Sequence, residues 1–345
     1  MNAKDSSLFA GFSRVKLLEQ ATPIQRLNRL EQALGTAVGG VRLFIKRDDG
    51  GLGGGGNKLR KLEFLLGEAL AQGCDTFITT GGLQSNHARL SAAAAAHVGL
   101  ACELVLAKVV PRTDLEYQRN GNVLLSGIFG AKIHEVPGTV NAVEFAKERA
   151  AVLKSEGRQP YVVGMGGSSP VGCLGYAVCA QEIADQERNI EGGFTQIVVP
   201  NGSSGTHAGL AAGFAAMGMS PARVRSYTVL SPVESAQKTT LDLARATLAQ
   251  IDQTHSIDAN AIDVAADQRG EGYGIPTAAM FDAVRILART EGLLLDPVYS
   301  GKAFAGLLAA VRSAVYKSGA AILFIMTGGT PGLFAYRPAF DDGSE

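Results

Sequence analysis

The stretch that decides the fold is Gly51-Leu52-Gly53-Gly54-Gly55-Gly56-Asn57-Lys58-Leu59-Arg60-Lys61. It joins a strand-like run at residues 41–47 to a segment, residues 62–70, whose apolar side chains recur at helical spacing. Lys58 is therefore expected in the first turn of a helix, where the helix dipole and the unpaired amides favour anions over cations. Two interpretations of this misplaced cation stay open. Its ammonium group points into solvent, or the lysine works without charge, as it does when condensed with an aldehyde in a Schiff base.

Length, charge and cysteine content restrict the class of protein. With 345 residues the chain is long enough for two lobes and a cleft between them. Lysine plus arginine equals aspartate plus glutamate at 32 each, so the net charge is zero and no field attracts nucleic acid or an anionic membrane. No apolar run reaches membrane-spanning length, and the N-terminus lacks the apolar core of a signal peptide. The four cysteines lack the paired spacing of a zinc site, so we expect a cytoplasmic protein with free thiols and no metal, acting on a small ligand.

Strand-like and helix-like segments alternate along most of the chain. Short apolar runs predict strands at residues 76–80, 102–107, 132–136, 196–199, 225–230 and 321–326. Helical spacing between them predicts an α/β fold, with parallel sheets covered by helices and a site at the carboxyl ends of the strands. A glycine-rich break at residues 164–170 is the best candidate for a junction between lobes. Residues 24–34 predict a polar helix.

Two turns have the form of anion sites. Gly202-Ser203-Ser204-Gly205-Thr206 follows an apolar strand and opens a helix, so amides, dipole and hydroxyl groups could converge on a phosphate. The alternative is a tight turn with a threonine cap. Gln84-Ser85-Asn86-His87 has the same form earlier in the chain, where the amides would suit a carboxylate and the Ser85 hydroxyl could move a proton. An ordinary helix cap is the alternative there.

Three further residues lie where site residues are common. Tyr273 and Tyr299 are in loops flanked by glycine and proline. Thr327 ends the last apolar strand, where its hydroxyl could meet a ring nitrogen. Each has an ordinary alternative, which is packing for the tyrosines and a turn for the threonine.

The glycine run also satisfies the dinucleotide pattern G-x-G-x-x-G through Gly51, Gly53 and Gly56. A dinucleotide-binding oxidoreductase is therefore an alternative of a different class. The strand before the run carries charges, including Lys46 and Asp48, whereas the first strand of a dinucleotide fold is usually buried on both faces. That context counts against the dinucleotide interpretation. A third alternative is a binding protein that keeps the pocket without turnover.

Taken together, the motifs resemble the pyridoxal-phosphate enzymes that group D-cysteine desulfhydrase with 1-aminocyclopropane-1-carboxylate deaminase. The resemblance extends from residue 17 to residue 338 and rests on six ordered motifs, at residues 55–63, 84–87, 202–209, 271–276, 295–299 and 327–329. It implies a two-lobed tryptophan-synthase-β-like fold, the type II fold of these enzymes, and a homodimer. The larger, cofactor-binding lobe would comprise residues 1–56 and 173–345. The smaller lobe, residues 57–172, would carry the Schiff-base lysine and the carboxylate-binding turn.

The resemblance also implies roles for single residues. Lys58 would form the Schiff base with pyridoxal 5'-phosphate, Asn57 would contact the pyridoxal hydroxyl, and Thr327 would meet the pyridine nitrogen. Tyr273 and Tyr299 would face the reacting carbon. The phosphate would be held by Gly202, Ser203, Ser204, Gly205 and Thr206, and the substrate carboxylate by Ser85, Asn86 and His87, with Ser85 also in a catalytic role.

Ser300 and Thr327 favour one reaction within the family. The deaminases resemble one another in a glutamate directly after the tyrosine of the Asp-Pro-Val-Tyr motif, and Ser300 stands there in this chain. A carboxylate would keep the pyridine protonated and a strong electron sink, whereas the hydroxyl of Thr327 leaves it mostly neutral, which suits prompt loss of a β leaving group. We therefore expect α,β-elimination of D-cysteine to pyruvate, sulfide and ammonia. The alternatives within the family are 1-aminocyclopropane-1-carboxylate deaminase and L-cysteate sulfo-lyase.

Overall fold

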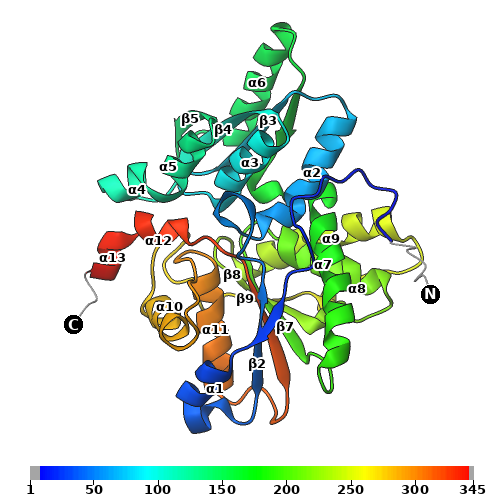
Figure 1. The fold of residues 1–345 in the computed structure, drawn as a ribbon, viewed down its shortest axis with the longest axis vertical. Coiled ribbons are helices and arrows are strands. Elements are labelled where there is room, and N and C mark those ends of the chain that lie inside the picture. Colours follow the sequence, from blue (N-terminus) through cyan, green and yellow to red (C-terminus); the bar gives the residue numbers. More distant parts are fainter. Residues whose placement is uncertain (1–7, 342–345) are drawn as a thin grey trace.

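The structure, a computed structural model, describes residues 8–341 and has two lobes, each built on its own sheet (Figure 1). The larger lobe holds six strands in the order β1-β2-β10-β7-β8-β9. These strands are β1 (Ile24–Arg26), β2 (Arg42–Arg47), β7 (Gln196–Asn201), β8 (Val224–Thr228), β9 (Asp263–Ala265) and β10 (Ala321–Met326). Neighbours are parallel except at the edge, where β1 runs antiparallel to β2.

Different helices cover the two faces of the large sheet (Figure 1). Within β10, Ile322 and Phe324 face one cluster and Leu323 and Ile325 the other, because successive strand residues point to opposite faces. A strand buried on both faces accounts for the uninterrupted apolar run that predicted it. The first cluster is completed by α1 (Asn28–Leu34), α10 (Ala278–Glu291) and α11 (Ser300–Arg312), and the second by α7 (Pro170–Gln186) and α8 (Gly205–Ala216), against which α9 (Val233–Ile251) packs.

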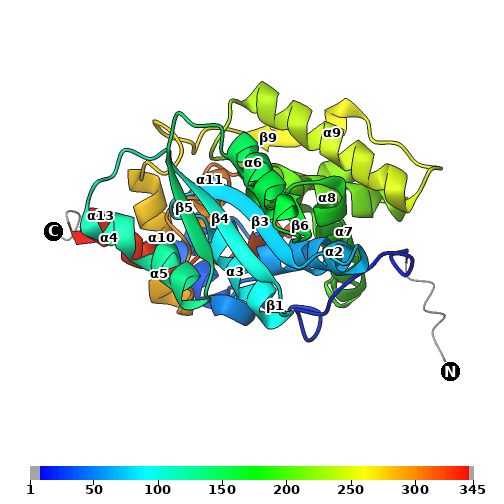
Figure 2. The same ribbon diagram turned by 90° about the horizontal axis from the view of Figure 1, so that it is seen from above.

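The smaller lobe has a four-stranded parallel sheet in the order β5-β4-β3-β6. It lies between helix α6 on one face and helices α2, α3 and α5 on the other (Figure 2). The strands are β3 (Thr76–Gly82), β4 (Ala101–Lys108), β5 (Lys132–Pro137) and β6 (Pro160–Val163), and the helices are α2 (Lys58–Ala71), α3 (Asn86–His97), α5 (Gly121–Ile128) and α6 (Ala142–Ser155). Three short helices, α4 (Leu115–Arg119), α12 (Pro331–Ala335) and α13 (Arg337–Asp341), lie along one side of the molecule.

Helices α2 and α7 connect the two lobes. Phe64 of α2 packs with Leu174 and Ala177 of α7 in one buried cluster. The two helices approach closely at Gly175, where a Cβ atom would lie 2.0 Å from the carbonyl oxygen of Arg60. Because α2 packs this closely against α7, the contact does not mark where one lobe ends and the other begins. The lobe limits at residues 57 and 172 stay a prediction.

Every strand expected from the sequence is present, but three details differ. Residues 24–34 were expected to be one helix; they form strand β1 and then α1, because β1 pairs with β2 at Gln25 and Ile45. The short strands β6 and β9 were not expected. The charged strand β2 was treated as a poor candidate for burial, yet Lys46 in it is fully buried. Among residues 8–341, no helix combines the length and apolar character needed to cross a bilayer.

Candidate active site

The glycine run forms the loop between β2 and α2 at the carboxyl edge of the large sheet. Gly51, Gly53, Gly54, Gly55 and Gly56 all have positive φ, between 65° and 138°, a region that residues with a Cβ rarely adopt. At Gly55 a Cβ would lie 1.9 Å from the carbonyl oxygen of Asp49. Glycine is therefore required for this path, which ends with the amide of Asn57 donating to the Thr327 carbonyl at 3.1 Å.

Lys58 is the first residue of α2, as the sequence predicted, and its amine lines a cavity between the lobes. The amine donates to Oδ1 of Asn57 at 2.9 Å, and no carboxylate of the described residues forms an ion pair with it. Burial and the nearby charge of Lys61 lower the pKa of Lys58 from its usual 10.5 to about 7. At neutral pH a large fraction of this amine is uncharged, so it is available as a nucleophile or a base. The solvent-pointing interpretation of Lys58 is wrong for this geometry.

The turn before α8 faces the same cavity. Ser204 holds a positive φ of 65°, supported by Asn201, whose Oδ1 accepts from the Ser204 amide at 3.1 Å. The Thr206 hydroxyl accepts from the Asn57 side chain at 3.1 Å, which joins this turn to the Lys58 loop. Ser203 exchanges a hydrogen bond of 2.8 Å with Ser168. Amides and hydroxyl groups at the start of a twelve-residue helix are groups that can bind an anion, as the sequence predicted for this turn.

Lys61, which the sequence reasoning passed over, is a buried cation directly behind this turn. Its amine donates to the Gly166 carbonyl at 3.1 Å and to the Ser168 hydroxyl at 2.9 Å. A Cβ on Gly205 would lie 2.6 Å from this amine, so the amine packs against the first residue of α8. Burial lowers the pKa of Lys61 to about 8. The signal that could have found it is its position one helical turn after Lys58, on the same face of α2.

The second turn, before α3, lies on the smaller lobe. The Ser85 hydroxyl caps the helix by accepting from the Ala88 amide at 3.1 Å, and Asn86 accepts from Asn122 at 2.9 Å. His87 is buried, and its Nε2 lies 2.8 Å from the Thr79 hydroxyl. Because that hydroxyl donates to the Val163 carbonyl at 3.0 Å, Nε2 of the ring carries the proton.

The other ring nitrogen of His87, Nδ1, is buried and has no partner among the described residues. Burial lowers the pKa of His87 well below 6.5, so the ring is neutral and Nδ1 is an acceptor. A carboxylate at this turn would therefore be met by amides and by the Ser85 and Asn86 side chains. The orphaned acceptor suits a donor group of the ligand, because a buried unpaired polar atom is costly.

Two tyrosines close the cavity from the larger lobe. Tyr273 comes from the loop between β9 and α10, and Tyr299 directly precedes α11. Their hydroxyl groups are 2.6 Å apart, so one donates to the other. Burial raises the pKa of Tyr273, and burial with the neighbouring Tyr273 raises that of Tyr299 well above 10. Both phenols are therefore protonated at neutral pH.

Thr327 and Ser300 differ in what their hydroxyl groups can reach. Thr327 ends β10 and lines the cavity. Ser300 is fully buried, and its hydroxyl both donates to Asp296 and accepts from the Asp296 amide, each at 2.8 Å. Only Thr327 of the two presents a hydroxyl to a ligand.

The structure brings the predicted site residues to one cavity at the carboxyl ends of β3, β7 and β10. Its walls include Asn57, Lys58, Ser85, Asn86, His87, Gly202, Ser203, Ser204, Gly205, Thr206, Tyr273, Tyr299 and Thr327. An amine that is partly uncharged at neutral pH, together with a turn whose amides and hydroxyl groups can meet an anion, fits a ligand with an aldehyde and a phosphate. The roles assigned to the single residues stay predictions.

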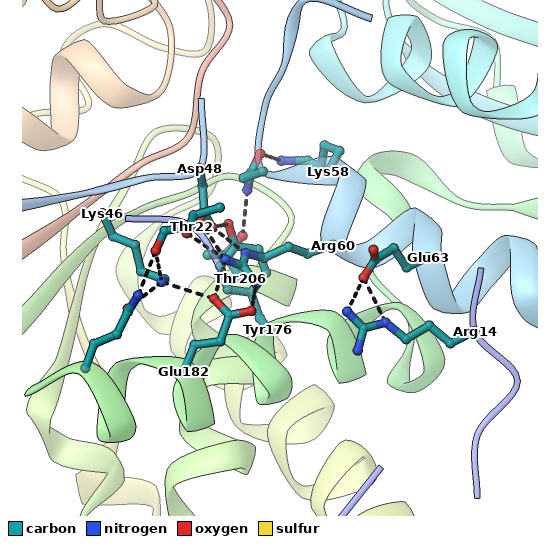
Figure 3. A network of polar contacts seen from close by, with 12 residues as sticks. Arg14, Thr22, Lys46, Asp48, Lys58, Arg60, Glu63, Tyr176, Glu182 and Thr206 are labelled. Carbon is teal, nitrogen blue, oxygen red and sulfur yellow. Dashed lines mark hydrogen bonds and ion pairs between the residues drawn. The ribbon is translucent and has the colours of Figure 1, made fainter. Parts of the chain in front are cut away.

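A second cluster of buried charges lies behind Lys58 (Figure 3). Arg60 forms two hydrogen bonds with Asp48, at 2.7 and 2.9 Å, and two with Glu182, at 2.9 and 2.8 Å. Lys46 pairs with Glu182 at 3.1 Å. Burial alone would raise the pKa of Asp48, but Arg60 outweighs it and the pKa is lowered. This cluster ties β2, α2 and α7 together.

Comparisons with known proteins agree with this site. A family model described as pyridoxal-phosphate dependent enzyme matches residues 15–328. The D-cysteine desulfhydrase of Serratia proteamaculans is 41% identical over 336 residues, which cover 95% of this chain and 97% of that protein. The same enzyme of Salmonella choleraesuis is 40% identical over 328 residues, with the same coverage. A crystal structure of an ACC deaminase homologue has a TM-score of 0.86 at 36% identity and covers 99% of both chains.

Proposed function

Since this chain belongs to the family of pyridoxal-phosphate dependent enzymes, we propose that it is a carbon-sulfur lyase that converts D-cysteine and water to pyruvate, hydrogen sulfide and ammonia. The observation that carries the proposal is the Lys58 amine. Its pKa is lowered to about 7, so part of it is uncharged at neutral pH, and it lines the same cavity as the turn before α8. The names of the relatives, which cover nearly the whole chain, support D-cysteine as the substrate.

The cofactor would be held at both ends by residues of this chain. The Ser203–Thr206 turn and Lys61 would bind the phosphate, Lys58 the aldehyde, Asn57 the ring hydroxyl and Thr327 the ring nitrogen. Pyridoxal phosphate, when bound, supplies an acceptor for the electrons released at the substrate Cα. The substrate carboxylate would lie at the start of α3, where the helix dipole favours it.

Two kinds of group in the cavity can move protons. Lys58, whose pKa is lowered to about 7, is suited to remove the proton from Cα. Tyr273 and Tyr299, whose pKa values are raised, are suited to donate a proton to the departing sulfur. We infer that the tyrosine pair is the acid and the lysine the base.

The hydroxyl of Thr327 favours elimination over cyclopropane opening. A carboxylate beside the ring nitrogen would keep it protonated, and the described residues place none among the walls of the cavity. Ser300 occupies the position of the deaminase glutamate, and its hydroxyl donates to Asp296 rather than to a ligand. This supports loss of a β substituent as the reaction.

The test is a side-by-side assay of D-cysteine, L-cysteine, L-cysteate and 1-aminocyclopropane-1-carboxylate on the full chain with cofactor. We expect equal amounts of sulfide and pyruvate from D-cysteine and the highest kcat/KM for it. Faster release of sulfite from L-cysteate, or of 2-oxobutyrate from the cyclopropane, would replace D-cysteine as the substrate. In a Tyr299→Phe variant, kcat should fall more than KM changes, because the acid acts after binding.

We also propose that the protein is a cytoplasmic homodimer. Its four cysteines are free thiols, which suits a reducing compartment. Helices α4, α5 and α12 contact one another, and each exposes large apolar side chains: Leu115 on α4, Leu124 and Ile128 on α5, and Phe334 on α12. Exposed apolar patches often mark interfaces. Sedimentation should give a dimer for the native chain and a monomer for Ile128→Asp; a native monomer would refute the dimer while leaving the lyase proposal intact.

A further inference from the structure

Arg89, on helix α3, is a buried cation without an acidic partner. Its side chain is fully buried, and no carboxylate of the described residues forms an ion pair with it. One arm donates to the Gly53 carbonyl and the other to the Gly55 carbonyl, the latter at 3.0 Å. Its Nε has no partner among the described residues. Taking an arginine out of water costs several kcal/mol, so this position requires a compensating reason.

The loop that Arg89 holds is costly to order. Residues 51–56 contain five glycines, and glycine loses more backbone freedom on folding than any other residue. The backbone hydrogen bonds that hold the loop lie mostly at its end: the Gly55 amide donates to the Leu52 carbonyl at 3.0 Å, the Leu59 amide to the Gly56 carbonyl at 3.1 Å, and the Asn57 amide to the Thr327 carbonyl at 3.1 Å. Arg89 supplies two rigidly spaced donors to carbonyls two residues apart, a geometry that a single ammonium group cannot reproduce.

Arg89 also links two parts of the cavity. It lies on α3, a few residues after the turn of Ser85 and Asn86, and it contacts the loop that ends at Lys58. Gly54 accommodates it, since a Cβ at this position would lie 3.2 Å from one arm of the guanidinium group. This side chain therefore bridges α3 and the loop that leads into α2.

We propose that Arg89 is a positioning residue, which clamps the glycine loop and thereby holds the Lys58 amine in register with the substrate-binding turn of α3. The importance of Lys58 rests on the proposed function, but the clamp itself does not. The charge of Arg89 also affects Lys58 directly. It is one of the causes that lower the pKa of Lys58, after burial and the charge of Lys61, whereas Asp296 raises that pKa.

Amide hydrogen exchange on the full chain, with and without pyridoxal phosphate, tests the clamp. In Arg89→Met, which keeps the length of the side chain and removes charge and donors, peptides covering residues 50–58 should exchange at least about tenfold faster, the scale of one lost charged hydrogen bond. Arg89→Lys keeps a cation and restores only part of the protection, because it lacks the fork. With cofactor and D-cysteine, kcat should fall in both variants while KM changes less.

Arg223→Met is the matched control. Arg223 is also largely buried and donates to a carbonyl, that of Phe194 at 3.0 Å, but it lies among residues of α8 and η4 (Glu187–Asn189) away from the cavity. It should leave exchange at residues 50–58 unchanged. Unchanged exchange of these residues in Arg89→Met, or equal acceleration across all peptides, would overturn the clamp. If Arg89→Met does not fold, full protection of residues 50–58 in Arg89→Lys would overturn the clamp equally.

Two further outcomes separate the clamp from the proposed function. Loss of lyase activity without faster exchange of the loop would overturn the clamp. Faster exchange in a chain that lacks lyase activity would refute only the proposed function.

Discussion

Two clusters of buried cations lie on either side of the start of helix α2, and they differ in one respect. The paired cluster, made of Lys46, Asp48, Arg60 and Glu182, matches its cations with carboxylates (Figure 3). The unpaired cluster, made of Lys58, Lys61 and Arg89, has carbonyl, amide and hydroxyl partners. Buried lysine and arginine therefore occur in two environments in this protein, one with carboxylate partners and one without.

The electrostatic consequences are opposite. In the paired cluster the pKa of Arg60 is raised well above its usual value and that of Asp48 is lowered, so both stay charged. In the unpaired cluster the pKa values fall to about 7 for Lys58, about 8 for Lys61 and about 10 for Arg89. Buried cations without counter-ions can be compensated by an anionic ligand, so we expect the chemistry at this cluster.

Removing the amine of Lys58 should have the largest effect on function. In Lys58→Ala, kcat/KM for D-cysteine should fall by about six orders of magnitude, the scale seen when a covalent nucleophile is lost. The fold should persist, because Lys58 makes one hydrogen bond, to its neighbour Asn57. Steady-state kinetics and circular dichroism measure the two results. The control is Lys147→Ala, at an exposed ion pair with Glu144. Activity near the native value in Lys58→Ala would remove this residue from the chemistry.

Breaking the paired cluster should reduce stability instead. Asp48→Asn leaves Arg60 with an incomplete set of acidic partners, and the free energy of unfolding should fall by about 3–5 kcal/mol, as for other buried pairs that lose one member. Urea denaturation measures this loss. Glu144→Gln, in the exposed pair with Lys147, should cost at most about 0.5 kcal/mol. Equal losses in the two variants would contradict the distinction between a buried and an exposed pair.

Lys61→Met should reduce cofactor affinity without harming the fold. A charged hydrogen bond to phosphate contributes about 1.5–3 kcal/mol, so the Kd for pyridoxal phosphate should rise roughly tenfold to a hundredfold. Fluorescence titration measures the Kd, and Lys61→Arg, which keeps the charge, should retain most of the affinity. Stability of the cofactor-free chain should not fall, in contrast to Asp48→Asn. An unchanged Kd would place the phosphate elsewhere.

The smallest effect is a pH dependence of the cofactor-free protein. Because the folded-state pKa values of Lys58 and Lys61 lie below the ordinary 10.5, the unfolded chain binds more protons than the folded one between about pH 7 and pH 10. The contribution of the two lysines is therefore least favourable below pH 7 and improves as the pH rises. Thermal unfolding of the native chain minus that of Lys58→Met/Lys61→Met should show this slope. A difference that is flat, or falls, over that range would contradict the lowered pKa values.

Much of this arrangement could be anticipated from the sequence. Parallel strands such as β10 and β7 are short apolar runs, and the turns at Ser85 and Ser203 directly follow such runs, so the site was expected at their carboxyl ends. Lys58 was identified because the helix dipole and the unpaired amides at a helix start disfavour a cation, so a lysine at this position indicates a functional role.

The rest depends on partners far apart in the chain. Lys46 and Asp48 suggested an unburied strand, because nothing local reveals that Arg60 and Glu182 neutralise them. Arg89 follows the substrate turn closely, yet its contact with Gly55 becomes visible only when α3 packs on the loop. Strand β1 was taken for a helix because its pairing with β2, some twenty residues on, determines its conformation.

Borohydride reduction of the protein carrying pyridoxal phosphate, followed by peptide mapping, tests the central distinction most directly. Reduction makes the bond between the cofactor and its lysine permanent, and mass spectrometry then identifies the lysine. We predict that the cofactor mass is found on Lys58, with Lys46 and Lys61 unmodified. A label on Lys46 or Lys61, or a protein that takes up no label, would contradict the account.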